Sequence, residues 1–354
     1  MAAHLLAVGS ATPGHDVHSA FIDWATHRVR PDRRALFARM AARAGIEHRW
    51  SVLPAQANGG GPTAPGGFYA DERLPGTAAR MEIYAHAAPD LALAAIDALE
   101  RQRPIGAVTH MVVASCTGFV APGLDQIIAQ RLRLPGSVER LLIGFMGCYA
   151  AVAALRTARH LVRSEPGARV LVVCCELSTL HLRDTDEVEP LLAMLQFGDG
   201  AAAALVAAEP GGFVLEAPFA ATLPDSADLI RWTITDQGFA MDLSGEVPRR
   251  IAAALADPAF VQVTTAGRGP AGIDGWAVHA GGRSILDAVE QALDLPSDAL
   301  DAARGVLHRH GNMSSATLMF TLERLLAGPR IEHGVALAFG PGLAAEGLGF
   351  RSAP

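Results

Sequence analysis

The chain has 354 residues, of which 50% are hydrophobic and 18% are charged, and its formal net charge at pH 7 is −7. This composition suits a large apolar core, and a negative charge without any basic block argues against nucleic-acid binding as a main role. No apolar run is typical of a membrane span or a secretory leader, and the four cysteines form neither a disulfide framework nor a CxxC metal pair. We therefore expect a cytoplasmic protein without a bound metal.

Strand-like and helix-like runs alternate through the first two thirds of the chain. We predict strands at 5–8, 107–114, 141–143, 170–174 and 201–207, and helices near 31–44, 89–100, 124–131 and 150–162. The first of these helices carries most of a basic cluster, formed by Arg30, Arg33, Arg34, Arg39 and Arg43. This rhythm indicates an α/β fold in which helices cover both faces of the strands.

A turn at 209–212 separates this part from a second stretch with the same rhythm. There we predict strands at 275–279 and 334–339, a helix at 284–293 and another helix after Ser314. We therefore expect two similar halves, 1–209 and 210–354.

Cys148 is a candidate nucleophile because of what surrounds it in the sequence. It follows the predicted strand at 141–143, which we expect to be buried, and it precedes the alanine-rich helix at 150–162. In the first turn of such a helix a thiol meets the positive end of the helix dipole, which favours the thiolate. Gly147 beside it lets the thioester of another molecule approach closely. A small buried core cysteine fits this window alone equally well.

Two polar residues in glycine turns are candidates to act with this thiol. His279 ends a predicted strand, and we expect it to be exposed at the carboxyl edge, where the sites of α/β proteins gather. Asn312 lies in a glycine turn at the start of a helix. Taken alone, His279 is equally well explained as a structural histidine, and Asn312 is better explained as a helix cap.

Together Cys148, His279 and Asn312 form a coherent set for thioester chemistry. The thiolate accepts an acyl group, and a nearby imidazole keeps it ionised. The imidazole and the amide both donate hydrogen bonds to one thioester oxygen, which stabilises a tetrahedral intermediate or an enolate formed by decarboxylation. A papain-like hydrolase uses the same residue types, but it leaves the separate glycine turns around each of them unexplained.

Six windows carry a wider resemblance: GFMGCYAA, ARVLVVCCELSTLHL, FGDGAAAALV, WAVHAGGRSILDA, HGNMSSATLMF and AFGPGL. They resemble the type III polyketide synthases, the chalcone and stilbene synthase-like branch of the thiolase fold. The resemblance implies two βαβαβαββ halves in an αβαβα layered arrangement, a homodimer, and coenzyme A thioesters as substrates with no other cofactor and no acyl carrier protein. The turn after Cys116 and the GGR after His279 are closer to bacterial alkylresorcinol and alkylpyrone synthases than to plant chalcone synthases.

The resemblance also implies roles for individual residues. It makes Cys148 the nucleophile, and His279 with Asn312 the pair for decarboxylation and oxyanion binding. Phe197 matches one of two gatekeeping aromatics between the coenzyme A tunnel and the cavity, whereas the second position holds Met241, whose flexibility softens the gate. Cavity-lining positions that vary with starter and cyclisation mode hold His181, Trp232 and Ser314.

Arg39 and Arg43 match two basic positions that contact the phosphates of coenzyme A, and a third such position holds Leu36. From the pattern alone, a solvated basic helix face explains these arginines as well.

We interpret the chain as a decarboxylating Claisen condensation enzyme. It loads an acyl-CoA starter on Cys148, extends it with malonyl-CoA and cyclises the product to an alkylpyrone or an alkylresorcinol. A ketoacyl-ACP synthase III is the nearest alternative, since it carries the same three residues. A thiolase fits less well, because it needs a second catalytic cysteine and none follows Cys175. A catalytically inactive thiolase-fold binding protein is the alternative from another class.

Overall fold

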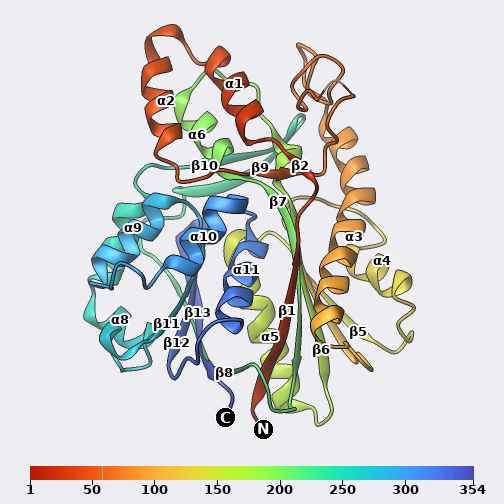
Figure 1. The fold of residues 1–354 in the computed structure, drawn as a ribbon, viewed down its shortest axis with the longest axis vertical. Coiled ribbons are helices and arrows are strands. Elements are labelled where there is room, and N and C mark those ends of the chain that lie inside the picture. The colour runs from red at the N-terminus through yellow and green to blue at the C-terminus, as the bar shows by residue number, and fades with distance from the viewer. Residues whose placement is uncertain (58) are drawn as a thin grey trace.

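A mixed β-sheet runs through the centre of the molecule (Figure 1), in a computed structural model that describes residues 1–57 and 59–354. Within these residues the sheet has nine strands. In spatial order they are β11 (Gly275–Val278), β12 (Gly334–Gly340), β13 (Ala344–Ser352), β8 (Phe213–Thr222), β1 (Ala3–Ala11), β7 (Asp199–Ala207), β6 (Arg169–Leu177), β4 (His110–Ala114) and β5 (Glu139–Ile143). Two further pairs are β9 (Ile230–Thr235) with β10 (Gly238–Leu243), and β2 (His15–Asp16) with β3 (Trp50–Ser51).

The two halves of this sheet repeat one pattern of pairing. In the first half β4 runs parallel to β6, β6 antiparallel to β7, and β7 antiparallel to β1. In the second half β11, β12, β13 and β8 follow the same sequence of parallel and antiparallel pairs. The predicted α/β thiolase fold is thus confirmed, although the second half of the described chain has no counterpart of β5.

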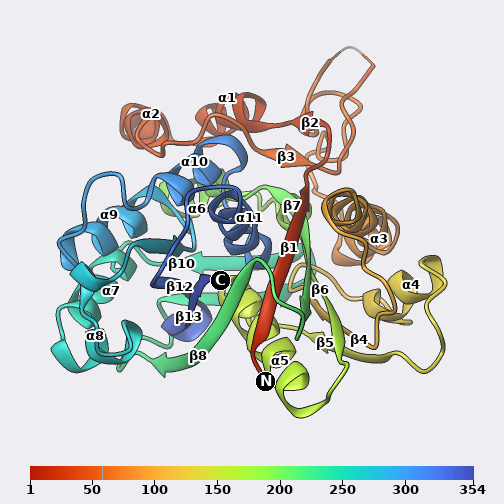
Figure 2. The ribbon, with the colours of Figure 1, turned by 60° about the horizontal axis from the view of Figure 1, so that its bottom comes forward.

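Helices lie on the outer faces of the sheet, between its halves, and over one end (Figure 2). The outer helices are α3 (Thr77–Gln102) and α4 (Leu124–Arg131) on the first half, and α7 (Val247–Leu255), α8 (Pro258–Thr264), α9 (Arg283–Ala292) and α10 (Asp301–His310) on the second. The central helices are α5 (Ala150–Ser164) and α11 (Ser315–Leu326). A cap at one end contains α1 (His18–Arg28), α2 (Arg34–Ala42), α6 (Val188–Gln196) and the β9–β10 hairpin. Each helix among the described residues is too short or too polar to span a membrane.

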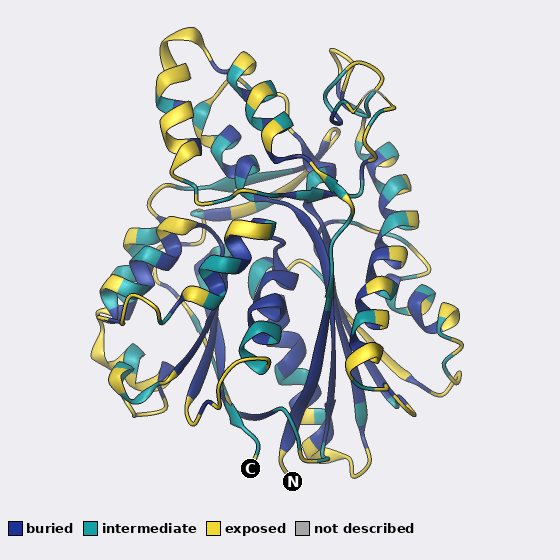
Figure 3. Ribbon diagram, in the orientation of Figure 1, coloured by how far each residue is buried: buried dark blue, intermediate teal, exposed yellow. Residues whose placement is uncertain are grey.

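Three hydrophobic clusters fill the spaces between these layers, and β6 illustrates how the sequence builds them. Side chains alternate between the two faces of a strand. Val172 and Cys174 therefore pack with α5 and α11 in the central cluster, whereas Val173 and Cys175 pack with α3 in the outer one. Both cysteines are fully buried. All side chains of α11 from Ser315 to Leu322 are buried, as a helix between two sheets requires (Figure 3).

Two predictions about these elements are wrong. The strand at 141–143 forms, but it is the exposed edge strand β5, in which Leu141 and Leu142 are 45% and 46% exposed. The helix expected near 89–100 begins at Thr77, and Pro89 lies inside it. Proline removes one helical hydrogen bond, but the buried face on both sides of Pro89 keeps the helix against the sheet.

Candidate active site

A tight turn between β5 and α5 presents Cys148 in a short 3₁₀ segment, Gly147–Tyr149. Gly147 has a φ of 66°, and a Cβ atom on it would lie 2.6 Å from Pro341, so only glycine fits there. Its N–H donates a hydrogen bond of 2.9 Å to the sulfur of Cys116. The backbone leading to Cys148 is therefore fixed by both shape and hydrogen bonding.

A second tight turn, between α10 and α11, presents Asn312. Its Oδ1 accepts hydrogen bonds from the Ser314 N–H (2.8 Å) and the Thr317 hydroxyl (3.3 Å), and its Nδ2 donates to the Gly281 carbonyl (3.2 Å). The amide orientation is thereby set, because every contact fits only one assignment of oxygen and nitrogen. Ser314 has a φ of 47°, an uncommon conformation that is often found at functional sites.

The backbone of Asn312 is also tied to the end of α6. Its N–H donates to the Gln196 carbonyl (2.7 Å), and its carbonyl accepts from the Gly198 N–H (3.0 Å). This bridge places Phe197 directly beside Asn312. The carbonyl of Phe197 accepts a further hydrogen bond of 2.7 Å from the buried guanidinium of Arg49.

The side chains of Asn312 and Ser314 reach the sulfur of Cys148. Burial is the largest influence on this thiol and raises the pKa of Cys148 to about 12, whereas the side chains of Ser314 and Asn312 act to lower it. The thiol is thus neutral in this structure, and the prediction that the helix dipole leaves it as a thiolate is wrong. Two polar side chains from the start of α11 nevertheless lie close to the atom where an acyl group would be held.

His279 lies at the end of β11, and it is 1% exposed rather than open at the strand edge as predicted. Among the described residues neither ring nitrogen has a hydrogen-bond partner. Burial lowers the pKa of His279 to about 3, so the imidazole is neutral and ionises no neighbour in this structure. A Cβ atom on Gly281 would lie 3.3 Å from this ring, and the Gly281 carbonyl holds the Asn312 amide, so both side chains approach the same residue.

Glu176 is a residue of this site that the sequence reading missed. It is fully buried near Cys148, and its carboxylate accepts hydrogen bonds from the Ser315 hydroxyl (2.5 Å), the Cys116 N–H (3.0 Å) and the Thr117 hydroxyl (2.9 Å). Burial raises the pKa of Glu176 to about 7 against these bonds. A single acidic residue within an otherwise apolar strand was the signal in the sequence, because such a residue is buried only when it is hydrogen-bonded.

Phe197, Met241, His181 and Trp232 line one cavity of about 70 Å³ under the cap. Met241 and Trp232 face each other across the β9–β10 hairpin. His181 is held by both ring nitrogens: Nε2 donates to the Thr117 carbonyl (2.7 Å), and Nδ1 accepts from the Phe239 N–H (3.0 Å). Burial lowers the pKa of His181 to about 4, so it is a neutral and immobile part of the wall. Ser314 is absent from this lining and contacts Cys148 instead.

Comparison with known proteins decides the family. Residues 1–210 match the N-terminal domain profile of the chalcone and stilbene synthases, and residues 215–354 match the C-terminal domain profile. The chain belongs to the chalcone and stilbene synthase family. It is therefore a type III polyketide synthase, an acyltransferase of a family that uses acyl-CoA and malonyl-CoA substrates. This result favours the polyketide synthase reading over the ketoacyl-ACP synthase III alternative.

Individual relatives of this type III polyketide synthase agree. It is 35% identical over 287 residues to "Alpha-pyrone synthesis polyketide synthase-like Pks18" from Mycobacterium tuberculosis, covering 77% of this chain and 72% of the relative. The C-terminal type III polyketide synthase domain of Steely1 from Dictyostelium superposes with a TM-score of 0.90 at 25% identity, covering all of both chains. PKS-I from the brown alga Ectocarpus siliculosus superposes with a TM-score of 0.88 at 27% identity, covering 99% of this chain and 98% of the other.

The two arginines of the synthase that were expected to contact coenzyme A lie apart from the buried site. Arg39 and Arg43 are exposed on and just after α2, in the cap, and neither lines the cavity behind Phe197. They are four residues apart and therefore lie on one face of the helix. Leu36, at the third expected position, belongs to the same face and is half-buried.

Proposed function

We propose that this type III polyketide synthase loads an acyl-CoA starter on Cys148, extends it with malonyl-CoA and cyclises the product to an alkylpyrone or an alkylresorcinol. The observation that carries this proposal is that Asn312 and Ser314 act on the Cys148 thiol while His279, whose nitrogens have no partner in the described part of the chain, approaches the same Gly281 as Asn312. The α-pyrone in the name of the Mycobacterium tuberculosis relative favours the alkylpyrone.

Loading begins when the neutral imidazole of His279 takes the proton of the Cys148 thiol. The thiolate attacks the carbonyl carbon of the acyl-CoA, and the oxyanion that forms accepts a hydrogen bond from the Asn312 amide. The intermediate collapses to an acyl thioester on Cys148. Coenzyme A leaves as a thiolate and takes the proton from the His279 imidazolium, so the imidazole is neutral again.

Extension begins with malonyl-CoA in the place that coenzyme A has left. Its carboxylate departs as carbon dioxide, and the electron pair of the broken bond forms the enolate of acetyl-CoA. His279 and Asn312 donate hydrogen bonds to the enolate oxygen, and Phe197 beside Asn312 excludes water from the leaving carboxylate. The enolate carbon attacks the acyl group on Cys148, the Cys148 thiolate departs, and a β-ketoacyl-CoA results. A neutral His279 suits this step, because decarboxylation itself supplies the carbanion.

The starter we propose is an alkyl chain rather than a bulky aromatic. The cavity behind Phe197 has mostly apolar walls, and one side of its gate is the flexible side chain of Met241. Trp232, next to Met241 on the same hairpin, and His181 also fill space in this wall, where they pack edge to face with ring centroids 5.7 Å apart. Arg39 and Arg43 bind the phosphates of coenzyme A at the surface.

The assignment of Cys148 is tested by acyl transfer to a variant. The Cys148→Ala protein should fold normally and form no covalent adduct with any of a panel of acyl-CoAs, as measured by intact-protein mass spectrometry. Cys175→Ala, which changes another buried cysteine, is the matched control and should retain the adduct. An acyl adduct on the Cys148→Ala protein would show that the nucleophile is elsewhere. An unmodified native protein, with a thiol inert to alkylation, would favour the inactive binding protein.

The active form we propose is a homodimer, as the family resemblance implies. Four large apolar side chains are exposed near the open edge strand β5: Phe119 (70%), Leu141 (45%), Leu142 (46%) and Phe145 (73%). Such a patch at an unpaired sheet edge is costly in water, and a second copy of the chain would cover it. Light scattering of the native protein should give twice the chain mass of 37.0 kDa, and a mass of one chain at micromolar concentration would contradict the dimer.

A further inference from the structure

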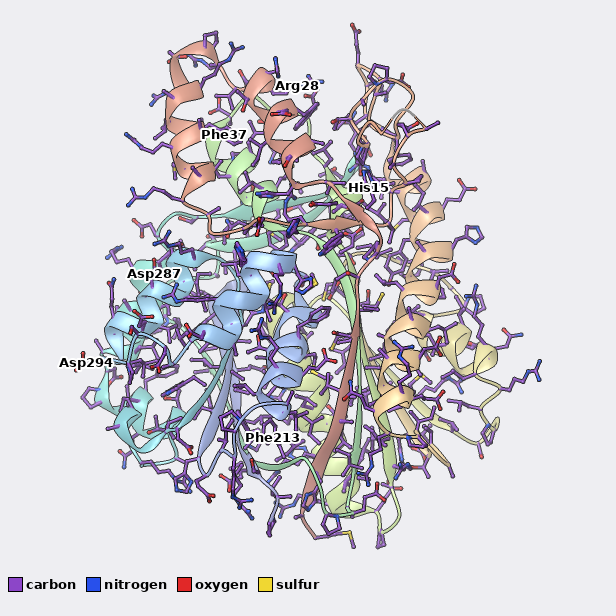
Figure 4. All side chains as sticks on the ribbon, in the orientation of Figure 1. His15, Arg28, Phe37, Phe213, Asp287 and Asp294 are labelled. Carbon is purple, nitrogen blue, oxygen red and sulfur yellow. The ribbon has the colours of Figure 1, made fainter. Side chains whose placement is uncertain are left out.

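An arginine from the second half of the chain lies at the end of α2, next to the two arginines expected to contact coenzyme A. Arg283 is the first residue of α9, four residues after His279. Its Nη1 lies 3.5 Å from the Arg43 carbonyl oxygen, and its side chain is the one nearest to Gly45. In both ribbon views α2 lies over α9 (Figures 1 and 2), and Figure 4 marks the two helices by Phe37 and Asp287.

Carboxylates of the described residues balance the positive charge around Arg283 only in part. Its Nε lies 3.5 Å from Asp287, but that carboxylate is held more closely by Arg304, at 2.7 Å. Within the described residues Arg39 and Arg43 have no carboxylate partner, and α2 contains no acidic residue. Of these three arginines only Arg283 therefore has a carboxylate partner among the described residues, and it shares that partner with Arg304. Like charges brought together in this way create a positive potential that attracts an anion.

The place of Arg283 in the chain links this potential to the buried site. The segment between His279 and Arg283 contains Gly281, whose carbonyl accepts the hydrogen bond from the Asn312 amide. One end of this short segment thus contributes to the catalytic site, and the other end reaches the exposed basic face of α2. A substrate that places its thioester beside His279 and Asn312 and an anionic group at the surface would contact both His279 and Arg283.

We propose that Arg283, together with Arg43, binds a phosphate group of the coenzyme A thioesters and supplies the cation that Leu36 does not provide. This inference rests on the proposed function, in which coenzyme A thioesters are the substrates. A guanidinium group is suited to the task, because it can donate two parallel hydrogen bonds to one phosphate. Arg283 also helps to hold the end of α2 through the Arg43 carbonyl, so the test must separate phosphate binding from a structural role.

The test compares Arg283→Gln with Arg330→Gln in steady-state assays with malonyl-CoA. Arg330 is a matched control: its side chain is 52% exposed against 54% for Arg283, and it too contacts one carboxylate, of Glu332, and one backbone carbonyl, of Ala353. Arg283→Gln should raise the KM for malonyl-CoA about tenfold with little change in kcat, because one charge-assisted contact to the substrate is lost. Arg330→Gln should leave both constants unchanged, and Arg283→Lys should recover part of the loss.

Malonyl-N-acetylcysteamine, a thioester without any phosphate, separates the two roles of Arg283. With this substrate Arg283→Gln and the native protein should have the same KM. An equal loss with both substrates would assign Arg283 a structural role only and overturn the proposal, as would an unchanged KM for malonyl-CoA. The malonyl thioester of 3′-dephospho-coenzyme A then tells which phosphate is bound. If Arg283 binds the 3′-phosphate, Arg283→Gln should not change the KM for this substrate. If Arg283 binds the diphosphate, the substitution should still raise that KM.

Binding of coenzyme A itself, measured by titration calorimetry, distinguishes failure of this inference from failure of the proposed function. If the native protein binds coenzyme A and Arg283→Gln binds it equally well, only the role of Arg283 is wrong. If the native protein does not bind coenzyme A at all, the proposed function is wrong as well.

Discussion

The Cys148 site and the cavity behind Phe197 lie next to each other, yet they are held together in different ways. At the Cys148 site, hydrogen bonds that involve backbone groups fix the Gly147 turn and the amide of Asn312. In the cavity the walls are mainly packed side chains, with Met241 and Trp232 on one hairpin. The difference indicates that the fold itself determines the chemistry, whereas a few exchangeable side chains determine which substrate fits.

Among the substitutions that test this difference, removal of the Asn312 amide is expected to reduce activity most. In Asn312→Ala the decarboxylation of malonyl-CoA should fall by about 10²–10³-fold, because one donor to the enolate oxygen is lost. The measurement is release of carbon dioxide in parallel with acyl loading of Cys148. Loading should fall as well, since the same amide donates to the oxyanion that forms when Cys148 attacks the acyl-CoA. An unchanged rate of carbon dioxide release from the folded variant would mean that Asn312 holds the turn and is not an oxyanion donor.

The buried carboxyl of Glu176, in the Cys148 site, should make the free energy of unfolding depend on pH. Its pKa is about 7 in the folded chain against an ordinary value of 4.5. The folded state therefore favours the protonated carboxyl, and its contribution to stability is fully present below pH 4.5 and is lost as pH rises to 7. The free energy of unfolding should fall by about 3 kcal/mol over this range through Glu176 alone.

Chemical denaturation of the native protein and Glu176→Gln at pH 4.5 and 7.5 measures this contribution. The variant should lack that part of the pH dependence, because its side chain does not ionise. If both proteins lose stability in parallel between the two pH values, Glu176 is ionised at low pH in the folded chain as well, and the site tolerates the charge.

The sequence was sufficient to predict the elements of the fold, because these depend on local patterns. It also marked Cys148, His279 and Asn312 as candidates, and their catalytic roles stay a prediction. The spacing of apolar residues predicts β6 and α5. Glycine turns mark the three positions at which Cys148, His279 and Asn312 lie between predicted elements. The predicted helix at 124–131 coincides with α4.

What the sequence could not supply is the environment that tertiary packing creates. Burial of His279 and the pKa of Cys148 depend on layers contributed by distant segments, so the predicted exposure and ionisation were both wrong. The exposure of β5 was missed because its apolar residues read as a core strand, although they lie at an open edge. Glu176 was missed because its three hydrogen-bond donors come from residues 59 to 139 positions away in the chain.

Substitutions in the cavity wall are expected to reduce activity less than substitutions in the Cys148 site. Met241→Phe measures the size of this smaller effect. A phenyl ring at this position stiffens the gate and takes space from a flexible starter, so kcat/KM for a long alkyl-CoA should fall about three- to tenfold. Thr233→Phe is the matched control, because it adds the same ring to the same hairpin at an exposed position on the opposite face. Decarboxylation of malonyl-CoA in the absence of a starter should not change in either variant. If Met241→Phe slows decarboxylation as strongly as it slows use of the starter, the gate and the Cys148 site form one mechanical unit and the contrast between them fails.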